Sequence, residues 1–381
     1  MRGSIGEITR LANNLTSHPR AEFGLLFLTR EPIADLTSYA CAADDEGLHS
    51  FWLAEGPHWF RNFGGEIRGA LTTAAFIAAQ TQRIKIGIGI VSPYMRHPSI
   101  LAMEAAALDE MSGHRLIFGL GASKAGTKYL DIDIEKMTPV ATHRDAFAIM
   151  RGILGGEKFE HKGPVFSARV PALSSEVPKH RINMPIYLAA TGPRMGQLAG
   201  AVADGLLLPG LTTPGLVRFA KENLAIGAKR ANRVLPEDFP IGACLVASVS
   251  RDGPRARQRA RMMATTYLAN KILNIKDHNL LDAVGLTPEE AAPIFAALQR
   301  GERDSLHEHV NDEILRKTYV ITGTPEEAAR TLATFLSLGV NLPMFEVHGD
   351  TPGDKLETIR LLAREVIPQA QQIVAGERGA T

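Results

Sequence analysis

The stretch that decides the fold is Ile186–Gly210, which reads IYLAATGPRMGQLAGAVADGLLLPG. An apolar run stops at Thr191-Gly192-Pro193, a helix-period segment follows, and a second apolar run, Leu206–Leu208, closes the unit. Glycine and proline at the helix start leave the first amide N–H groups without partners inside the helix, so this turn predicts an anion site. Arg194 lies one residue into that helix.

Similar strand-turn-helix units recur along the whole chain. The apolar runs are Phe23–Leu28, Ser50–Ala54, Ile84–Val91, Arg115–Leu120, Pro185–Ala190, Asp204–Leu208, Ile241–Ser250 and Leu342–Val347. Long runs rich in Ile, Val and Leu are typical of parallel strands that are covered on both faces. Eight such units predict an α/β fold, a closed (β/α)8 TIM barrel, with its chemistry at the C-terminal ends of the strands.

Two stretches interrupt this alternation. Residues 157–184 are polar and mostly non-helical, whereas residues 251–319 are long and mostly helical. No linker or low-complexity segment divides the chain. We therefore expect one domain over residues 1–381, with insertions around 157–184 and 251–319.

Composition excludes several classes of protein. The 381 residues carry 42 Lys and Arg against 41 Asp and Glu, a balance that argues against a nucleic-acid binder. No apolar stretch reaches the roughly 20 residues of a membrane span, and the N-terminus lacks a signal-peptide core. Cys41 and Cys244 form no CxxC pair, so we expect neither a disulfide framework nor a metal site, and a reducing cytoplasm fits.

Polar side chains follow two of the expected strands. Glu55 directly follows Ser50–Ala54 and His58 comes three residues later; a carboxylate here could hold a substrate and an imidazole could act as acid or base. The alternative for Glu55 is an ion pair with an arginine inside the barrel. Glu346 and His348 form a similar candidate pair at the end of Leu342–Val347.

Glycines mark the third and fourth strands. Gly87 and Gly89 lie inside Ile84–Val91, where glycine usually indicates a bulge or the close approach of a ligand or another backbone. The sequence GLGAS at Gly119–Ser123 lacks the third glycine of a dinucleotide fingerprint. It is either a loop that closes on a flat ligand or a plain glycine-rich turn.

Four motifs carry a resemblance to a known family. They are VSPYMRHP (Val91–Pro98), LDEMSGHRLIFGLGAS (Leu108–Ser123), ATGPRMGQLAGAVADGLLL (Ala190–Leu208) and GTPEEAARTL (Gly323–Leu332). Together they resemble the bacterial luciferase-like superfamily, and within it the branch of coenzyme F420-dependent methylenetetrahydromethanopterin reductases and their relatives. The resemblance extends from about Phe23 to Ile367.

The resemblance implies a cofactor site at the strand C-termini. It places a non-proline cis peptide at Gly89-Ile90, as a bulge behind a deazaflavin or flavin ring, with Ser92 beside the ring. Thr127 falls where relatives make a polar contact to the ring or its side chain. The residues implied to line the ribityl chain and phosphate are Ala190, Thr191, Gly192 and Pro193. Two positions depart from the family pattern: Gly56 follows Glu55 where many relatives have histidine, and Lys124 stands where sugar-phosphate dehydrogenases have a glutamate proton donor.

The resemblance implies an oxidoreductase that transfers a hydride between coenzyme F420 and an unidentified small organic substrate. The alternative is an FMN-dependent monooxygenase that uses oxygen and reduced flavin from a separate flavin reductase. A third hypothesis, a flavin-binding protein without activity, is disfavoured by the polar residues Glu55, His58 and Lys124. Relatives commonly dimerise through barrel helices, so the Ala-rich segments Arg68–Thr81 and Ser99–Met111 predict a homodimer.

Overall fold

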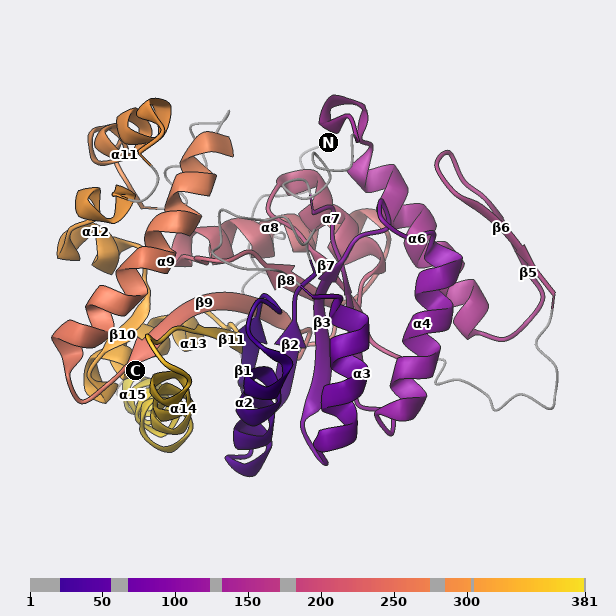
Figure 1. Ribbon diagram of the computed structural model, residues 1–381. Helices are drawn as coiled ribbons and strands as arrows, with labels where there is room; N and C mark the ends of the chain where they lie inside the picture. Colours follow the sequence, from indigo (N-terminus) through magenta and orange to yellow (C-terminus); the bar gives the residue numbers. More distant parts are fainter. Residues whose placement is uncertain are drawn as a thin grey trace.

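The computed structural model describes residues 21–55, 68–123, 132–171, 183–274, 285–302 and 305–379. Within them, eight parallel strands form a barrel, which the pairing of β8 with β9 closes (Figure 1). The strands are β1 (Gly24–Phe27), β2 (Ser50–Leu53), β3 (Lys85–Val91), β4 (Leu116–Leu120), β7 (Ile186–Ala189), β8 (Gly205–Leu208), β9 (Ile241–Val249) and β11 (Leu342–Val347). The predicted (β/α)8 barrel is confirmed, and each strand lies within two residues of its expected bounds.

Helices cover the outside of the barrel. They are α2 (Ile33–Asp45), α3 (Ala70–Gln80), α4 (Pro98–Met111), α6 (Pro139–Leu154), α7 (Pro193–Val202), α8 (Pro214–Arg230), α13 (Pro325–Ser337) and α14 (Pro352–Leu361). A π-helical turn (Leu362–Val366) joins α14 to α15 (Ile367–Gly379), so the closing helical segment runs to Gly379. No helix in the described ranges combines the length and the apolar character that crossing a bilayer requires.

Side chains alternate between the barrel interior and the helix layer because strand residues point to opposite faces in turn. On β2, Phe51 and Leu53 pack against helices, whereas Trp52 points into the barrel and is completely buried. Leu26, Tyr187 and Met344 pack in the same interior cluster. The barrel is therefore filled by side chains below its mouth.

The described part of residues 157–184, expected to be mostly non-helical, contains an antiparallel hairpin that the sequence did not specify. Strands β5 (Phe159–Lys162) and β6 (Ser167–Val170) pair antiparallel and project from the barrel (Figure 1). Asp145 of α6 holds the hairpin, since its carboxylate accepts hydrogen bonds from His161 at 3.0 Å and from the Phe166 amide at 2.9 Å.

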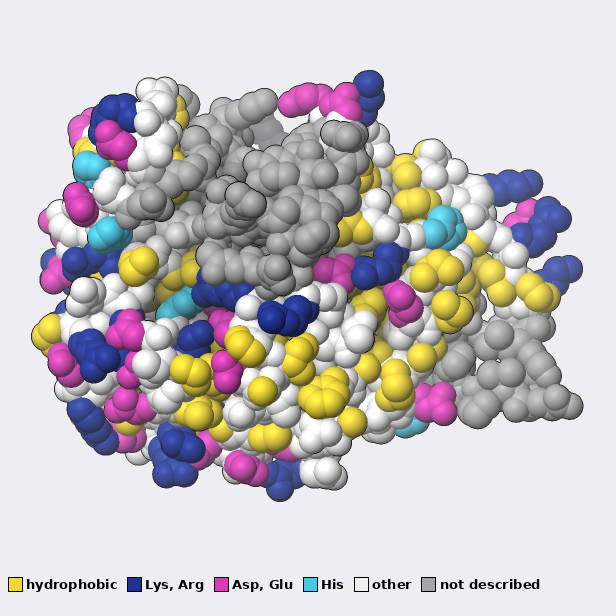
Figure 2. Space-filling model, in the orientation of Figure 1, with side chains coloured by type: hydrophobic (Ala, Val, Ile, Leu, Met, Phe, Trp, Pro, Cys, Tyr) yellow, Lys and Arg dark blue, Asp and Glu magenta, His cyan; other side chains and the backbone are white. Residues whose placement is uncertain are grey.

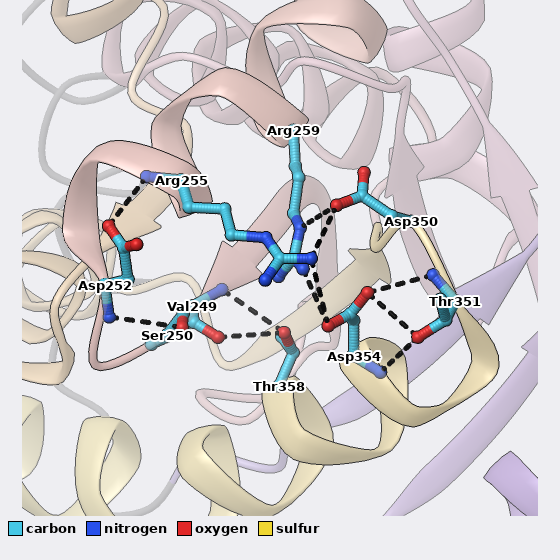
Figure 3. Close-up of polar contacts among 9 residues, drawn as sticks. All are labelled: Val249, Ser250, Asp252, Arg255, Arg259, Asp350, Thr351, Asp354 and Thr358. Atoms are coloured by element: carbon cyan, nitrogen blue, oxygen red, sulfur yellow. Dashed lines mark hydrogen bonds and ion pairs between the residues drawn. The ribbon is translucent and has the colours of Figure 1, made fainter.

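The described part of residues 251–319 is mostly helical, as expected. They include α9 (Gly253–Asn274), α11 (Pro288–Arg300), the 3-10 turn Leu306–His309 and α12 (Asp312–Lys317), followed by the short strand β10 (Ile321–Gly323) beside β9. The small apolar core of these helices includes the barrel residue Val246. Figure 3 shows a second attachment, where Arg259 of α9 meets Asp350 at 2.8 Å and Asp354 at 2.6 Å.

Candidate active site

A cavity of about 950 Å³ opens at the C-terminal ends of β2, β3, β4, β7 and β8. That volume is at the upper end of the range for small-molecule and cofactor sites. Seven of the predicted site residues line it, although they are spread over 139 positions of the sequence: Glu55, Gly89, Ile90, Ala190, Thr191, Gly192 and Pro193. The fold therefore brings together residues that are distant in the sequence and share only their position at the ends of predicted strands.

The floor of the cavity is a bulge in β3. The peptide bond between Gly89 and Ile90 is cis, as the family resemblance implies, and the register between β3 and β4 shifts at this point. Neighbouring backbone holds the bulge, because the Glu55 amide donates to the Ile90 carbonyl at 3.2 Å and the Gly121 amide donates to the Val91 carbonyl at 3.0 Å. Ile90 consequently faces the cavity beside Gly121.

Glycines in β3 and directly after β4 allow neighbouring side chains to pack closely around the bulge. A Cβ atom on Gly87 would lie 2.1 Å from the Trp52 ring, and one on Gly121 would lie 2.8 Å from the Ile90 side chain. Gly87 thus makes room for a buried side chain, whereas Gly89 and Gly121 both line the cavity. The glycine-rich segment after β4 fits tightly against β3, a role that neither of the two sequence interpretations included.

The N-terminus of α7 faces the same cavity. Its N-cap residue is Gly192, no side chain caps the helix, and a Cβ atom on Gly192 would meet nothing within 4 Å. The first intrahelical bond runs from Gly196 to the Gly192 carbonyl at 3.1 Å. The N–H groups of the first turn are therefore available to an anion in the cavity, as the sequence predicts.

Glu55 forms an ion pair with an arginine, which was the alternative to a role in substrate binding or proton transfer. Both of its carboxylate oxygens bind Arg96, one of them at 3.0 Å, and Oε2 also accepts from the Ala70 amide at 3.3 Å. The hydrogen bonds to Glu55 raise the pKa of Arg96 above its usual value. Glu104 lies 3.7 Å from the same guanidinium. The pair joins the end of β2 to the segment between β3 and α4.

The remaining predicted residues have different positions. Ser92 is buried, donates to the Ala122 carbonyl at 3.2 Å, and is not among the described residues that line the cavity. His58, Thr127 and Lys124 lie outside the described residues.

A second polar cluster lies at the C-terminal ends of β1 and β11, beside α9. Glu346, only 2 % exposed, accepts from the Tyr267 hydroxyl at 2.5 Å and contacts His348 Nε2 at 3.2 Å. Arg30 lies 3.4 Å from His348 Nδ1. Since an arginine only donates, this contact assigns the acceptor role to Nδ1 and the proton to Nε2. Burial, and then the Glu346 carboxylate, raise the pKa of Tyr267 well above its ordinary value.

Arg144 and the first turn of α6 are cavity residues that were not predicted from the sequence. Thr138, Pro139 and Arg144 all line the cavity. Helix α6 begins at Pro139. Proline is common at the first position of a helix, so Thr138-Pro139 was a usable signal for a helix start at this place.

Known proteins resemble this chain over most of its length. The profile of the luciferase-like monooxygenase family matches residues 13–342. The chain belongs to this family. A curated relative, the 5,10-methylenetetrahydromethanopterin reductase of Methanolobus tindarius, is 28% identical over 91% of this chain and 99% of its own length. The F420-dependent glucose-6-phosphate dehydrogenase of Nakamurella multipartita is 23% identical over 90% of this chain and 94% of its own length.

Solved structures share the fold of this luciferase-like chain. The coenzyme F420-dependent tetrahydromethanopterin reductase of Methanopyrus kandleri superposes with a TM-score of 0.78, at 23% identity, covering 92% of this chain and 99% of that one. A monooxygenase from Streptomyces bottropensis superposes with a TM-score of 0.68, at 21% identity, covering 91% and 99%. At these identities the superpositions establish the fold alone.

Proposed function

We propose that this protein is an oxidoreductase that binds coenzyme F420 and moves a hydride between that cofactor and a small organic substrate. The observation that carries the proposal is the single cavity that joins the Gly89-Ile90 bulge to the uncapped N-terminus of α7. The lining residues fit coenzyme F420. Small side chains leave room for its ring system, and the uncapped amides of α7 can donate hydrogen bonds to its phosphate. The relatives named for F420-dependent activity support the same cofactor.

The chain's own residues would position the reaction. When bound, the deazaflavin would supply the hydride chemistry, and the protein would supply orientation and electrostatics. Ile90 would support one face of the ring, while Ala190, Thr191, Gly192 and Pro193 would line the ribityl chain and phosphate. In this arrangement Glu55 fixes the wall of the cavity through Arg96, and His58, Thr127 and Ser92 stay predictions.

The test is a fluorescence titration of the purified protein with coenzyme F420 and, separately, with FMN. Saturable binding of F420 at least tenfold tighter than FMN supports the proposal. Binding of FMN alone, or of neither, overturns it. A Gly192→Val variant is the internal control, because its side chain would project into the cavity and should weaken whichever cofactor binds.

An FMN-dependent monooxygenase is the second candidate. The family description and the Streptomyces bottropensis monooxygenase favour it, and the cavity has room for an isoalloxazine ring as well. This activity would require oxygen and a separate flavin reductase. Oxygen consumption that depends on added reduced FMN would distinguish it from the F420 reaction.

We also propose that the chain acts in the cytoplasm as a single domain that forms a homodimer. The apolar core shared by Val246 and the inserted helices supports one domain, and neither Cys41 nor Cys244 forms a disulfide. Yellow side chains gather over α3 and α4 in Figure 2. The exposed apolar residues there are Phe76, Ile100, Met103 and Met111. Apolar patches of this kind mark interaction sites, so Met103→Glu should shift the mass measured by light scattering from dimer to monomer.

A further inference from the structure

The rim of the cavity carries two arginines that nothing so far explains. Arg144 of α6 and Arg194 of α7 both line the cavity, and both are exposed. Within the described part of the chain, neither guanidinium forms an ion pair with a carboxylate. Helices α6 and α7 pack side by side, so the two arginines lie on adjacent elements (Figure 1).

The charge of the cavity is one-sided. Among the described residues that line it, Glu55 is the one carboxylate, and Arg96 already neutralises it. Arg144 and Arg194 therefore leave a net positive rim. The uncapped amides at the start of α7 would hold the phosphate itself. The cavity therefore has positive groups beyond those that would bind the phosphate, namely the guanidinium groups of Arg144 and Arg194.

We propose that Arg144 and Arg194 form a subsite for an acidic chain attached beyond the phosphate, the oligoglutamate tail of coenzyme F420. FMN ends at its phosphate and has no carboxylate that these arginines could bind. The subsite therefore selects the deazaflavin cofactor over the flavin by charge, and the ring pocket need not discriminate between them. The inference rests on the proposed function, since it assigns residues to one part of the proposed cofactor.

The experiment measures the dissociation constants of three ligands by fluorescence titration: F420 with its glutamates, F420 from which the glutamates have been removed, and FMN. An exposed charge pair contributes up to about fivefold in affinity. Arg144→Ala and Arg194→Ala should each weaken binding of tailed F420 by about fivefold and leave the other two ligands within about twofold. Raising the salt concentration should reduce the tail's advantage, because ions screen exposed charges.

Two controls separate charge from folding. Arg144→Lys and Arg194→Lys keep the charge and should retain most of the preference for the tail. Arg218→Ala, on the exposed surface of α8 and away from the cavity lining, changes the net charge equally and should leave all three constants unchanged.

Each outcome decides a distinct question. Equal affinity of the wild-type protein for tailed and tail-less F420 overturns the subsite but leaves the proposed function standing. Equal losses for all three ligands in the alanine variants also overturn it, because the arginines would then serve the phosphate or the fold. If the wild-type protein binds FMN and neither form of F420, the subsite and the proposed function fall together.

Discussion

Replacing Glu55 with glutamine removes the negative charge that Arg96 and the Ala70 amide bind. The guanidinium left behind is 29% exposed and keeps Glu104 at 3.7 Å, so we expect a loss of only about 1–2 kcal/mol in the free energy of unfolding. Arg96→Met is more costly, at about 3 kcal/mol, because it leaves a carboxylate that is 8% exposed with one backbone donor. The double variant removes both charges and should lose about 2 kcal/mol, which is about 2–3 kcal/mol less than the sum of the two single losses and gives a coupling of that size.

Urea unfolding followed by tryptophan fluorescence measures all four proteins, since Trp52 is completely buried in the folded state. A coupling below about 0.5 kcal/mol would refute the reasoning that this pair fixes the cavity wall. The catalytic interpretation predicts the opposite pattern for Glu55→Gln. If Glu55 is an acid or base, the variant should unfold at the wild-type urea concentration and bind the cofactor normally while turnover is lost.

Three further predictions concern other parts of the barrel. Gly87→Ala should cost about 2–3 kcal/mol by overpacking against the Trp52 ring, whereas Gly376→Ala, which meets nothing within 4 Å, should be neutral or stabilising in thermal melts. Burial lowers the pKa of Lys221 to about 8. Between that pH and 10.5 the unfolded chain therefore holds a proton that the folded chain has released, so stability rises with pH. Urea titrations should show the wild-type protein gaining up to ~3 kcal/mol over this window relative to Lys221→Met. Arg259→Met should expose the amides of α9 to faster hydrogen exchange, because a side chain only 4% exposed loses both of its aspartate partners; unchanged exchange would mean that apolar packing alone holds the helix.

Most of the fold could be predicted from the sequence because each barrel strand shows the same pattern. Each buried strand is a continuous apolar run between turn residues, and each run falls at the expected place in the chain. The hairpin β5–β6 has no such run, since its strands alternate partly buried and exposed residues, including Glu160 and Lys162. β10 has only three residues and was missed for lack of length.

The candidate site was less accessible to sequence reasoning than the fold. Its lining residues follow strand ends, so the strand order was enough to bring Glu55, Gly89 and Gly192 together. The partner of Glu55 could not be chosen in advance, because the choice between a free carboxylate and an ion pair depends on where Arg96 lies in three dimensions. Gly87 illustrates the same limit: its contact is a tryptophan from the neighbouring strand, which no local pattern identifies.

The hydrogen bond between Tyr267 and Glu346 has a consequence for how this chain can be recombined with its relatives. A chimera that received α9 from another family member without a tyrosine at this position would leave a buried carboxylate without its hydroxyl donor. Exchange of the inserted helices would then succeed only together with a change in β11. Among homologous sequences, the phenol at 267 and the carboxylate at 346 should accordingly be inherited as a pair.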